Sequence, residues 1–159
     1  METWQVSLIS LVAGFFLAAV PQWFDRRRNV VAYWKALREE IEYCHKIAIG
    51  LVPAGVAGGL RRLPTAIYKE AFPRIVAQGE VEELEVAAIL LYYDFVQQVN
   101  ASLDITGAAL ERNDQPRAIQ EFGRMALKAQ RFEAGHGEHI YDNAIAIANQ
   151  HCSKGWWRY

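Results

Sequence analysis

Basic side chains repeat along residues 116–150 at spacings that place them on one side of a helix. Their separations are seven, four and three residues, and at 100° per residue the four positions fall within a sector about 60° wide. They are Arg117, Arg124, Lys128 and Arg131. Because guanidinium and ammonium groups bind phosphate, this stripe predicts a site for a phosphate-bearing ligand.

The segment "GGLRRLPTAIYKEAFPR" adds further cations. The residues expected to bind the ligand are Arg61, Arg62, Arg124, Lys128 and Arg131. A nucleotide, a short oligonucleotide or anionic lipid headgroups would fit this chemistry. Two other interpretations stay open: the stripe is simply solvated, or it pairs with the acidic helix that begins near residue 80.

Arg131 and His136 stand in an R-x4-H spacing within "RFEAGHGEHIYD". This spacing resembles the short motif of HEPN-type ribonucleases, in which Arg and His act on the RNA phosphate and 2′-hydroxyl. The resemblance implies a membrane-tethered ribonuclease with a cleft between two subunits, as an alternative function. Such a short spacing also arises by chance among surface residues.

The same segment contains two spacings typical of metal ligands. Glu133 and His136 form E-x-x-H, the spacing of di-iron sites in helical bundles, but the chain has no second such pair. His136, His139 and Asp142 are close enough in sequence to share one face of a helix. Surface polar residues near a helix break explain both spacings more simply, so we expect no metal, no cofactor and no catalytic residue.

Charge and cysteine content limit the class of protein. The chain has 159 residues and a net charge of −1. Near-neutrality argues against a general duplex binder, because duplex binding depends on neutralising many phosphates. Cys44 and Cys152 are the only cysteines, which fits a reducing cytosol rather than a disulfide framework.

The opening stretch "WQVSLISLVAGFFLAAVPQWF", residues 4–24, contains no charged side chain. As a helix it is roughly 30 Å long, the thickness of the hydrocarbon core of a bilayer. Trp4 and Trp23 sit near its two ends, where indole rings prefer the membrane interface. Asp25 follows this stretch, and after it come the basic residues Arg26, Arg27 and Arg28. The positive-inside rule therefore predicts a single-pass protein of the bacterial inner membrane, with its N-terminus outside and residues 29–159 cytosolic.

Two alternatives for this stretch fit less well. A signal peptide would need a basic start and a small-residue cleavage site, whereas here the basic cluster follows the apolar run. A buried helix of a soluble domain would more often have a polar stripe.

Small residues recur at every fourth position of the apolar run. Ser10, Gly14 and Ala18 match the small-xxx-small spacing that lets helices approach closely in lipid. This face predicts a homo-oligomer, and a conducting pore is one form that such an assembly takes. The alternative is that small residues are common in any membrane helix.

The remainder of the chain shows helical periodicity and no sustained alternation. Residues 29–49 read as a helix that continues the apolar run, and residues 50–64 read as a loop with several glycines. A short helix near 65–72, a helix from about residue 80 and a long helix over 116–150, weakened by Gly135 and Gly137, complete the pattern. The fold class expected is all-α: a transmembrane anchor at 1–28 and a cytosolic helical bundle at 29–159.

Apolar positions predict which face of each helix is buried. For residues 29–49 they are Val30, Val31, Trp34, Leu37, Ile41, Cys44 and Ala48. For the helix from residue 80 they are Val81, Leu84, Ala88, Leu91, Phe95 and Val99. For residues 116–150 they are Ile119, Phe122, Ala126, Ala129, Ile140, Ala144 and Ile147.

This layout resembles small bacterial single-span proteins that have an arginine-rich exit, "DRRR", and a long helix, "VVAYWKALREEIEYC". Among them are membrane effectors of anti-phage systems, such as the Hailong-type effector and the transmembrane partner of type VI-B CRISPR. The resemblance implies a homo-oligomeric effector or channel. Its bundle would respond to a nucleotide or oligonucleotide signal, or to a partner protein that produces the signal. A non-catalytic scaffold that holds a partner at the membrane is a further alternative.

Overall fold

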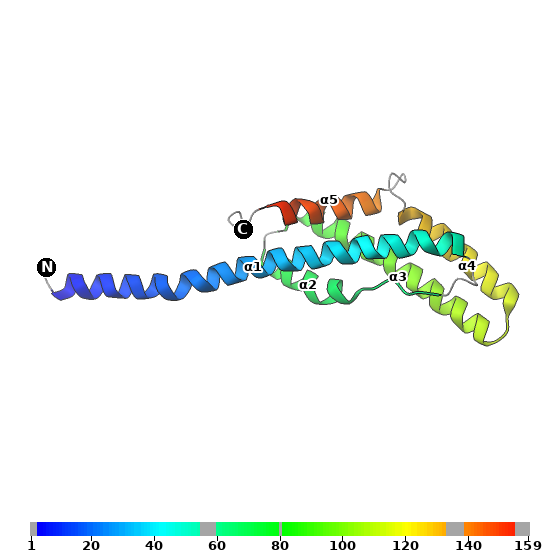
Figure 1. The fold of residues 1–159 in the computed structure, drawn as a ribbon, viewed down its shortest axis with the longest axis horizontal. Coiled ribbons are helices and arrows are strands. Elements are labelled where there is room, and N and C mark those ends of the chain that lie inside the picture. The colour runs from blue at the N-terminus through cyan, green and yellow to red at the C-terminus, as the bar shows by residue number, and fades with distance from the viewer. Residues whose placement is uncertain (1–2, 55–59, 80, 133–138, 155–159) are drawn as a thin grey trace.

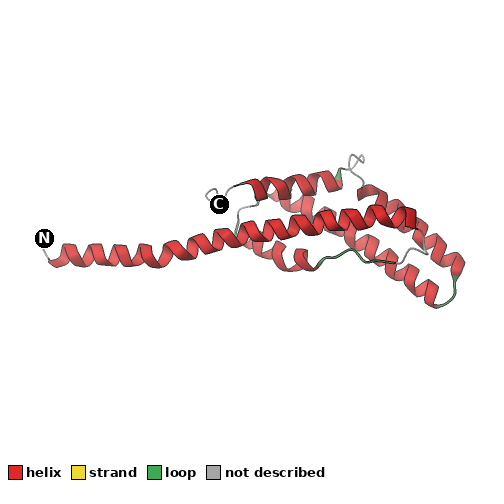
Figure 2. Ribbon diagram, viewed as in Figure 1, coloured by secondary structure: helices red, strands yellow, loops and turns green. Residues whose placement is uncertain are grey.

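The computed structural model describes residues 3–54, 60–79, 81–132 and 139–154. Every regular element within these ranges is a helix, which confirms the all-α prediction (Figure 2). In chain order they are α1 (Thr3–Ala54), α2 (Ala66–Ala77), α3 (Glu83–Glu111), α4 (Gln115–Ala129), the 3₁₀ turn η2 (Gln130–Phe132) and α5 (Ile140–Ser153).

Helix α1 is continuous from the apolar run into the bundle, as the sequence predicts. Its N-terminal part extends away from the other helices, and its C-terminal part runs through the bundle (Figure 1). Burial along α1 begins at Val30 and recurs at three- and four-residue steps. The covered positions are Val30, Trp34, Leu37, Ile41, Cys44 and Ala48, and Val31 is partly buried against the same core, so the face predicted for residues 29–49 is confirmed.

The other helices pack around the C-terminal part of α1. Helices α2 and α5 contact α1, while α3 contacts α4 and α5. The turn between α3 and α4 lies at the end of the molecule opposite the N-terminus (Figure 1). The long helix expected over residues 116–150 is divided into α4, η2 and α5, with residues 133–138, which include both weakening glycines, outside the described part.

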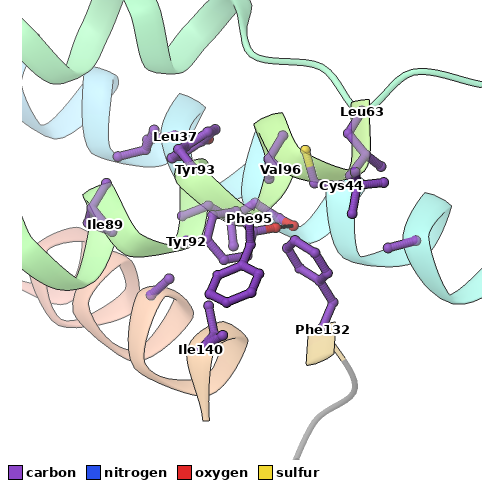
Figure 3. Packing of buried hydrophobic residues seen from close by; sticks show 14 of the residues in the cluster. Leu37, Cys44, Leu63, Ile89, Tyr92, Tyr93, Phe95, Val96, Phe132 and Ile140 are labelled. Atoms are coloured by element: carbon purple, nitrogen blue, oxygen red, sulfur yellow. Dashed lines mark hydrogen bonds between the residues drawn. The ribbon is translucent and has the colours of Figure 1, made fainter. Parts of the chain in front are cut away.

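Aromatic side chains of α3 fill the centre of the bundle. Tyr92 and Tyr93 are fully buried, and Phe132 packs edge-on against Tyr92 with ring centroids 5.3 Å apart (Figure 3). The Tyr92 hydroxyl donates a hydrogen bond of 2.9 Å to the backbone carbonyl of Ile41 on α1. The ring of Tyr92 therefore adds apolar area to the core, and its hydroxyl still has a hydrogen-bond partner.

The buried face of α3 differs from the predicted one. Leu84 is 81% exposed and Leu91 is 50% exposed, so these two predictions are wrong. Phe95 and Val99 are buried as predicted, and the other covered residues include Ile89, Tyr92, Tyr93, Val96 and Leu103. Ile119 of α4 is also exposed rather than buried, whereas Phe122, Ala129, Ile140 and Ala144 are covered as predicted.

Two buried polar side chains attach the start of α2 and the segment before it to the long helices. Glu40 of α1 accepts hydrogen bonds from the backbone N–H groups of Ile67 and Tyr68, at 2.8 and 2.9 Å. These are N–H groups of the first turn of α2, which lack partners within that helix. Asn100 of α3 makes a hydrogen bond to both the N–H and the carbonyl of Leu63. Residues 60–65 are thereby fixed along α3 although they have no regular structure.

Within the described part of the chain, no helix combines the length and the apolar character that crossing a membrane requires. The side chains of Trp4 and Ala18 are outside the described residues. The transmembrane assignment of residues 4–24 stays a prediction.

Candidate membrane-attachment site

An exposed apolar segment extends from the bundle along α1. Residues 10–24, called here the apolar projection, precede Val30, the first buried position among the side chains that the structure describes. Their exposed large side chains are Leu11, Val12, Phe15, Phe16, Leu17, Val20, Trp23 and Phe24. Leu17 is 77% exposed, so within the described residues nothing of the bundle covers it. Exposed apolar surface of this extent is typical of a region that contacts lipid or another protein.

Three consecutive arginines follow the apolar projection: Arg26, Arg27 and Arg28, called here the arginine collar. The guanidinium of Arg27 lies over the indole ring of Trp23, 3.6 Å from its centroid. Stacked in this way, Arg27 and Trp23 form an amphipathic pair with one apolar and one charged end. Helix α1 thus changes from apolar to cationic within about one turn.

A groove lies between α1 and the end of α2 at the level of the collar. Its volume is about 550 Å³, and we call it the collar groove. It is lined by Gln22, Asp25, Arg26, Asn29 and Tyr33 of α1 and by Arg74, Ala77 and Gln78 of α2 and the turn after it. Arg74 donates a hydrogen bond of 2.9 Å to the hydroxyl of Tyr33, and this bond, with Glu70 nearby, raises the pKa of Arg74. The side chain is therefore a fixed cation in one wall of the groove.

The five cations predicted to bind phosphate have separate surroundings. Arg62 pairs with Asp104 at 3.1 Å, and Lys128 donates to the hydroxyl of Ser102 at 3.1 Å. Positions 102 and 104 of a helix point about 200° apart, so Arg62 and Lys128 approach different sides of α3.

The other three predicted ligands lie at the surface. Arg61 is exposed, and Arg124 pairs with Glu121 of its own helix at 2.8 Å. The guanidinium of Arg131 lies 5.2 Å from the ring centroid of Phe95. The structure therefore brings Lys128 and Arg62 to α3 but does not gather the five cations into one pocket.

The residues considered for nuclease or metal chemistry are only partly described. Glu133 and His136 lie outside the described residues, so the R-x4-H and E-x-x-H predictions have no geometry to compare. His139 contacts Asp142 at 3.2 Å. Among the residues that the structure describes, no three metal-binding side chains come together.

The self-association face is described at two of its three positions. Ser10 and Gly14 are exposed, and the side chain of Ala18 is outside the described residues. A methyl group added at Gly14 would meet no atom of the same chain within 4 Å. The face at Gly14 is therefore open to a neighbouring molecule.

Sequence reasoning missed a buried polar pair that joins α3 to α5. His151 is fully buried, stacks on Trp34 with ring centroids 4.2 Å apart, and its Nε2 lies 3.0 Å from a carboxylate oxygen of Glu85. Burial raises the pKa of Glu85, but hydrogen bonds from the backbone of Glu82 and from His151 outweigh burial and lower it. No short spacing could have indicated a pair so far apart in the chain.

The contact between Arg74 and Tyr33 in the collar groove also could not be predicted from spacing. Arg74 and Tyr33 come from different helices, and only the packing of α2 on α1 brings them together.

A comparison of the chain with protein-family models, with curated proteins and with solved structures found no match to any of them.

Proposed function

We propose that this chain is a membrane-attached, self-associating helical protein, with the apolar projection in lipid and the helical bundle on the arginine-rich side. One observation supports this proposal above all: α1 exposes large apolar side chains along residues 10–24, shortly before the arginine collar, and among the described side chains burial by the bundle begins just after the collar, at Val30. The first part of α1 thus exposes apolar side chains that are more stable in lipid than in water, and the bundle covers its second part.

The energetics favour lipid over water around the projection. Moving a large apolar side chain out of water contributes about 1.5–3 kcal/mol when it becomes fully buried. The exposed large side chains of the projection are about half accessible on average, so together they would contribute roughly 10 kcal/mol on entering lipid. That is comparable with the whole folding stability of a small domain.

The charge pattern gives the orientation. Positive charges next to an apolar segment stay on the cytosolic side of the inner membrane, so the bundle would be cytosolic and the N-terminus outside. Trp23 and Phe24 are at the level where aromatic side chains accumulate near headgroups.

The open face at Gly14 supports self-association. Helices in lipid associate through van der Waals contact between small residues, and Gly14 has space for a neighbouring backbone. Copies of the chain would contact one another along Ser10, Gly14 and Ala18.

The response to a ligand is a separate part of the proposal. Arg117, Arg124 and Lys128 of the basic stripe belong to α4, which lies at the end of the bundle away from the projection, and Arg131 belongs to η2 directly after it (Figure 1). This distance from the membrane favours a nucleotide or oligonucleotide from solution over lipid headgroups as its ligand. An effector or channel role then predicts ligand-dependent dye release from liposomes that contain the protein, whereas a scaffold predicts none.

Alkaline carbonate extraction of membranes tests the attachment itself. We expect the wild-type chain to stay in the pellet and the Leu11→Arg/Phe15→Arg double variant to move to the supernatant, because each arginine in the span costs about 3 kcal/mol. The control is Ile119→Arg/Leu127→Arg on α4, because Phe15 and Leu127 are equally exposed, at 68%. Wild-type protein in the supernatant, or equal release of both double variants, would contradict the proposal.

A further inference from the structure

The collar groove has one wall from each of two helices. Gln22, Arg26, Asn29 and Tyr33 follow one another on α1 at steps of four, three and four residues, so they share one face of that helix. Arg74, Ala77 and Gln78 come from the last turn of α2 and the turn after it. Both walls are described, and the groove extends along α1 from the bundle to the end of the apolar projection.

Its charged side chains favour an anion. Arg26 and Arg74 contribute two positive charges, and Asp25 contributes one negative charge. The amides of Gln22, Asn29 and Gln78 add hydrogen-bond donors. The lining residues therefore have a net positive charge and several hydrogen-bond donors.

Arg74 is held in place before any ligand binds. Its guanidinium donates to the hydroxyl of Tyr33, lies 5.6 Å from the centroid of that ring, and pairs with Glu70 at 3.4 Å. A guanidinium has five N–H donors, more than these two oxygens accept. A fixed cation with remaining donors loses little side-chain entropy when it binds a phosphate.

We propose that the collar groove binds the phosphodiester headgroup of an anionic phospholipid, with Arg26 and Arg74 on the phosphate oxygens. This inference rests on the proposed function, because a projection embedded in lipid brings the groove to headgroup level. A phospholipid fits better than free phosphate, because Gln22 of the lining belongs to the apolar projection, whose exposed side chains acyl chains would cover. Within the lining, Arg26 and Arg74 outnumber the one carboxylate, Asp25, and this favours anionic over zwitterionic lipid.

Native mass spectrometry of the full chain in detergent measures this binding directly. The probes are a short-chain phosphatidylglycerol, the matching phosphatidylcholine and inorganic phosphate. The variants are Arg26→Gln and Arg74→Gln, and the control is Arg27→Gln. Arg27 has the same charge and belongs to the same collar, but its guanidinium lies over Trp23 and it does not line the groove.

We expect phosphatidylglycerol to bind at least tenfold more tightly than phosphatidylcholine. Each groove variant should weaken that binding about tenfold, the usual effect of losing one charge-assisted hydrogen bond, and Arg27→Gln should leave it within about twofold. Equal effects of all three variants would indicate diffuse attraction by the positive charges of this region and would contradict binding in the collar groove. Equal binding of the two lipids would also overturn it, and inorganic phosphate bound as tightly as phosphatidylglycerol would overturn a lipid as its ligand.

The detergent measurement is independent of attachment. In the carbonate test, a chain whose projection is not embedded moves to the supernatant. In detergent, headgroup binding is lost only if the groove lacks the proposed affinity. A chain that extracts with carbonate yet binds phosphatidylglycerol through Arg26 and Arg74 would contradict the proposed function alone.

Discussion

Glu40 is a buried carboxylate that joins three elements of the bundle. It lies on α1, it accepts hydrogen bonds from the first turn of α2, and the hydroxyl of Tyr93 on α3 donates to it at 2.8 Å. The ring of Tyr93 in turn stacks on Tyr68 of α2, with centroids 3.8 Å apart. Thr65, at the N-cap position of α2, makes no side-chain capping hydrogen bond, so Glu40 caps α2 from another helix.

Replacing Glu40 with alanine should lower the free energy of unfolding by about 3 kcal/mol, because two backbone N–H groups and one phenol lose their buried acceptor. Glu40→Gln should cost less, about 1–2 kcal/mol, because the amide retains one acceptor oxygen. Urea unfolding followed by circular dichroism measures both. Glu39→Gln is the control, since that side chain is 65% exposed and should change the free energy by under about 1 kcal/mol. Equal losses of unfolding free energy at positions 39 and 40 would contradict the role of Glu40 in capping α2.

Cys44 gives the bundle a measurable sensitivity to alkaline pH. Burial, with a smaller effect of Glu40, raises the pKa of its thiol from 9.0 to about 12. The unfolded chain therefore releases this proton at a lower pH than the folded chain does. The stability linked to Cys44 is fully present below about pH 9 and is lost as pH rises to about 12.

Removing the thiol should flatten the alkaline part of the stability profile. We expect Cys44→Ala to reduce the slope between pH 9 and 11 by up to one proton, or about 1.4 kcal/mol per pH unit. Tyr92 and Tyr93, whose pKa values burial also raises, should keep part of the slope in the variant. Urea midpoints at several pH values supply the comparison, and parallel profiles for the two proteins would show that the thiol does not titrate as proposed.

Individual polar residues could be predicted by type but not by partner. The sequence indicates an arginine-rich exit from the apolar run, and the structure adds that Arg27 stacks on Trp23. Glu40, Asn100 and His151 have partners 27 to 66 positions away, so no local spacing indicates them. Only the packing of distant helices determines these contacts.

Helices themselves were predictable where one face is clearly apolar. Within residues 29–49 charged side chains separate the apolar ones, and that face is confirmed in α1. The stretch "VAAILLYYDFV" of α3 is apolar on nearly all sides, so periodicity alone does not select a face. The large rings of Tyr92 and Tyr93 turn inward and leave Leu84 and Leu91 outside.

The corrected face of α3 has a direct test. Ile89→Ala should lower the free energy of unfolding by about 2–4 kcal/mol, because Ile89 is fully buried. Leu91→Ala, at a half-exposed position, should cost under about 1 kcal/mol. Thermal or urea unfolding distinguishes them. A cost at Leu91 as large as that at Ile89 would mean that a second copy covers this face.

At the scale of the whole molecule, self-association should depend on the projection and not on the bundle. Gly14→Leu should reduce the oligomer fraction several-fold in detergent, because the larger side chain prevents close approach of two helices. The control is Gly123→Leu on α4, since an added methyl group meets no atom within 4 Å at either glycine. Analytical ultracentrifugation gives the fractions. An unchanged Gly14→Leu oligomer would place the contact elsewhere.

The environment of the apolar projection is best measured by the accessibility of a spin label in liposomes. Phe16 of the projection and Ile119 of α4 are similarly exposed in the isolated chain, at 59% and 62%, and each is replaced by a labelled cysteine. We predict that the label at position 16 collides often with oxygen, which concentrates in lipid, and rarely with a water-soluble nickel complex, and that the label at position 119 does the reverse. Equal collision with nickel at the two positions would contradict the proposal that lipid surrounds the projection.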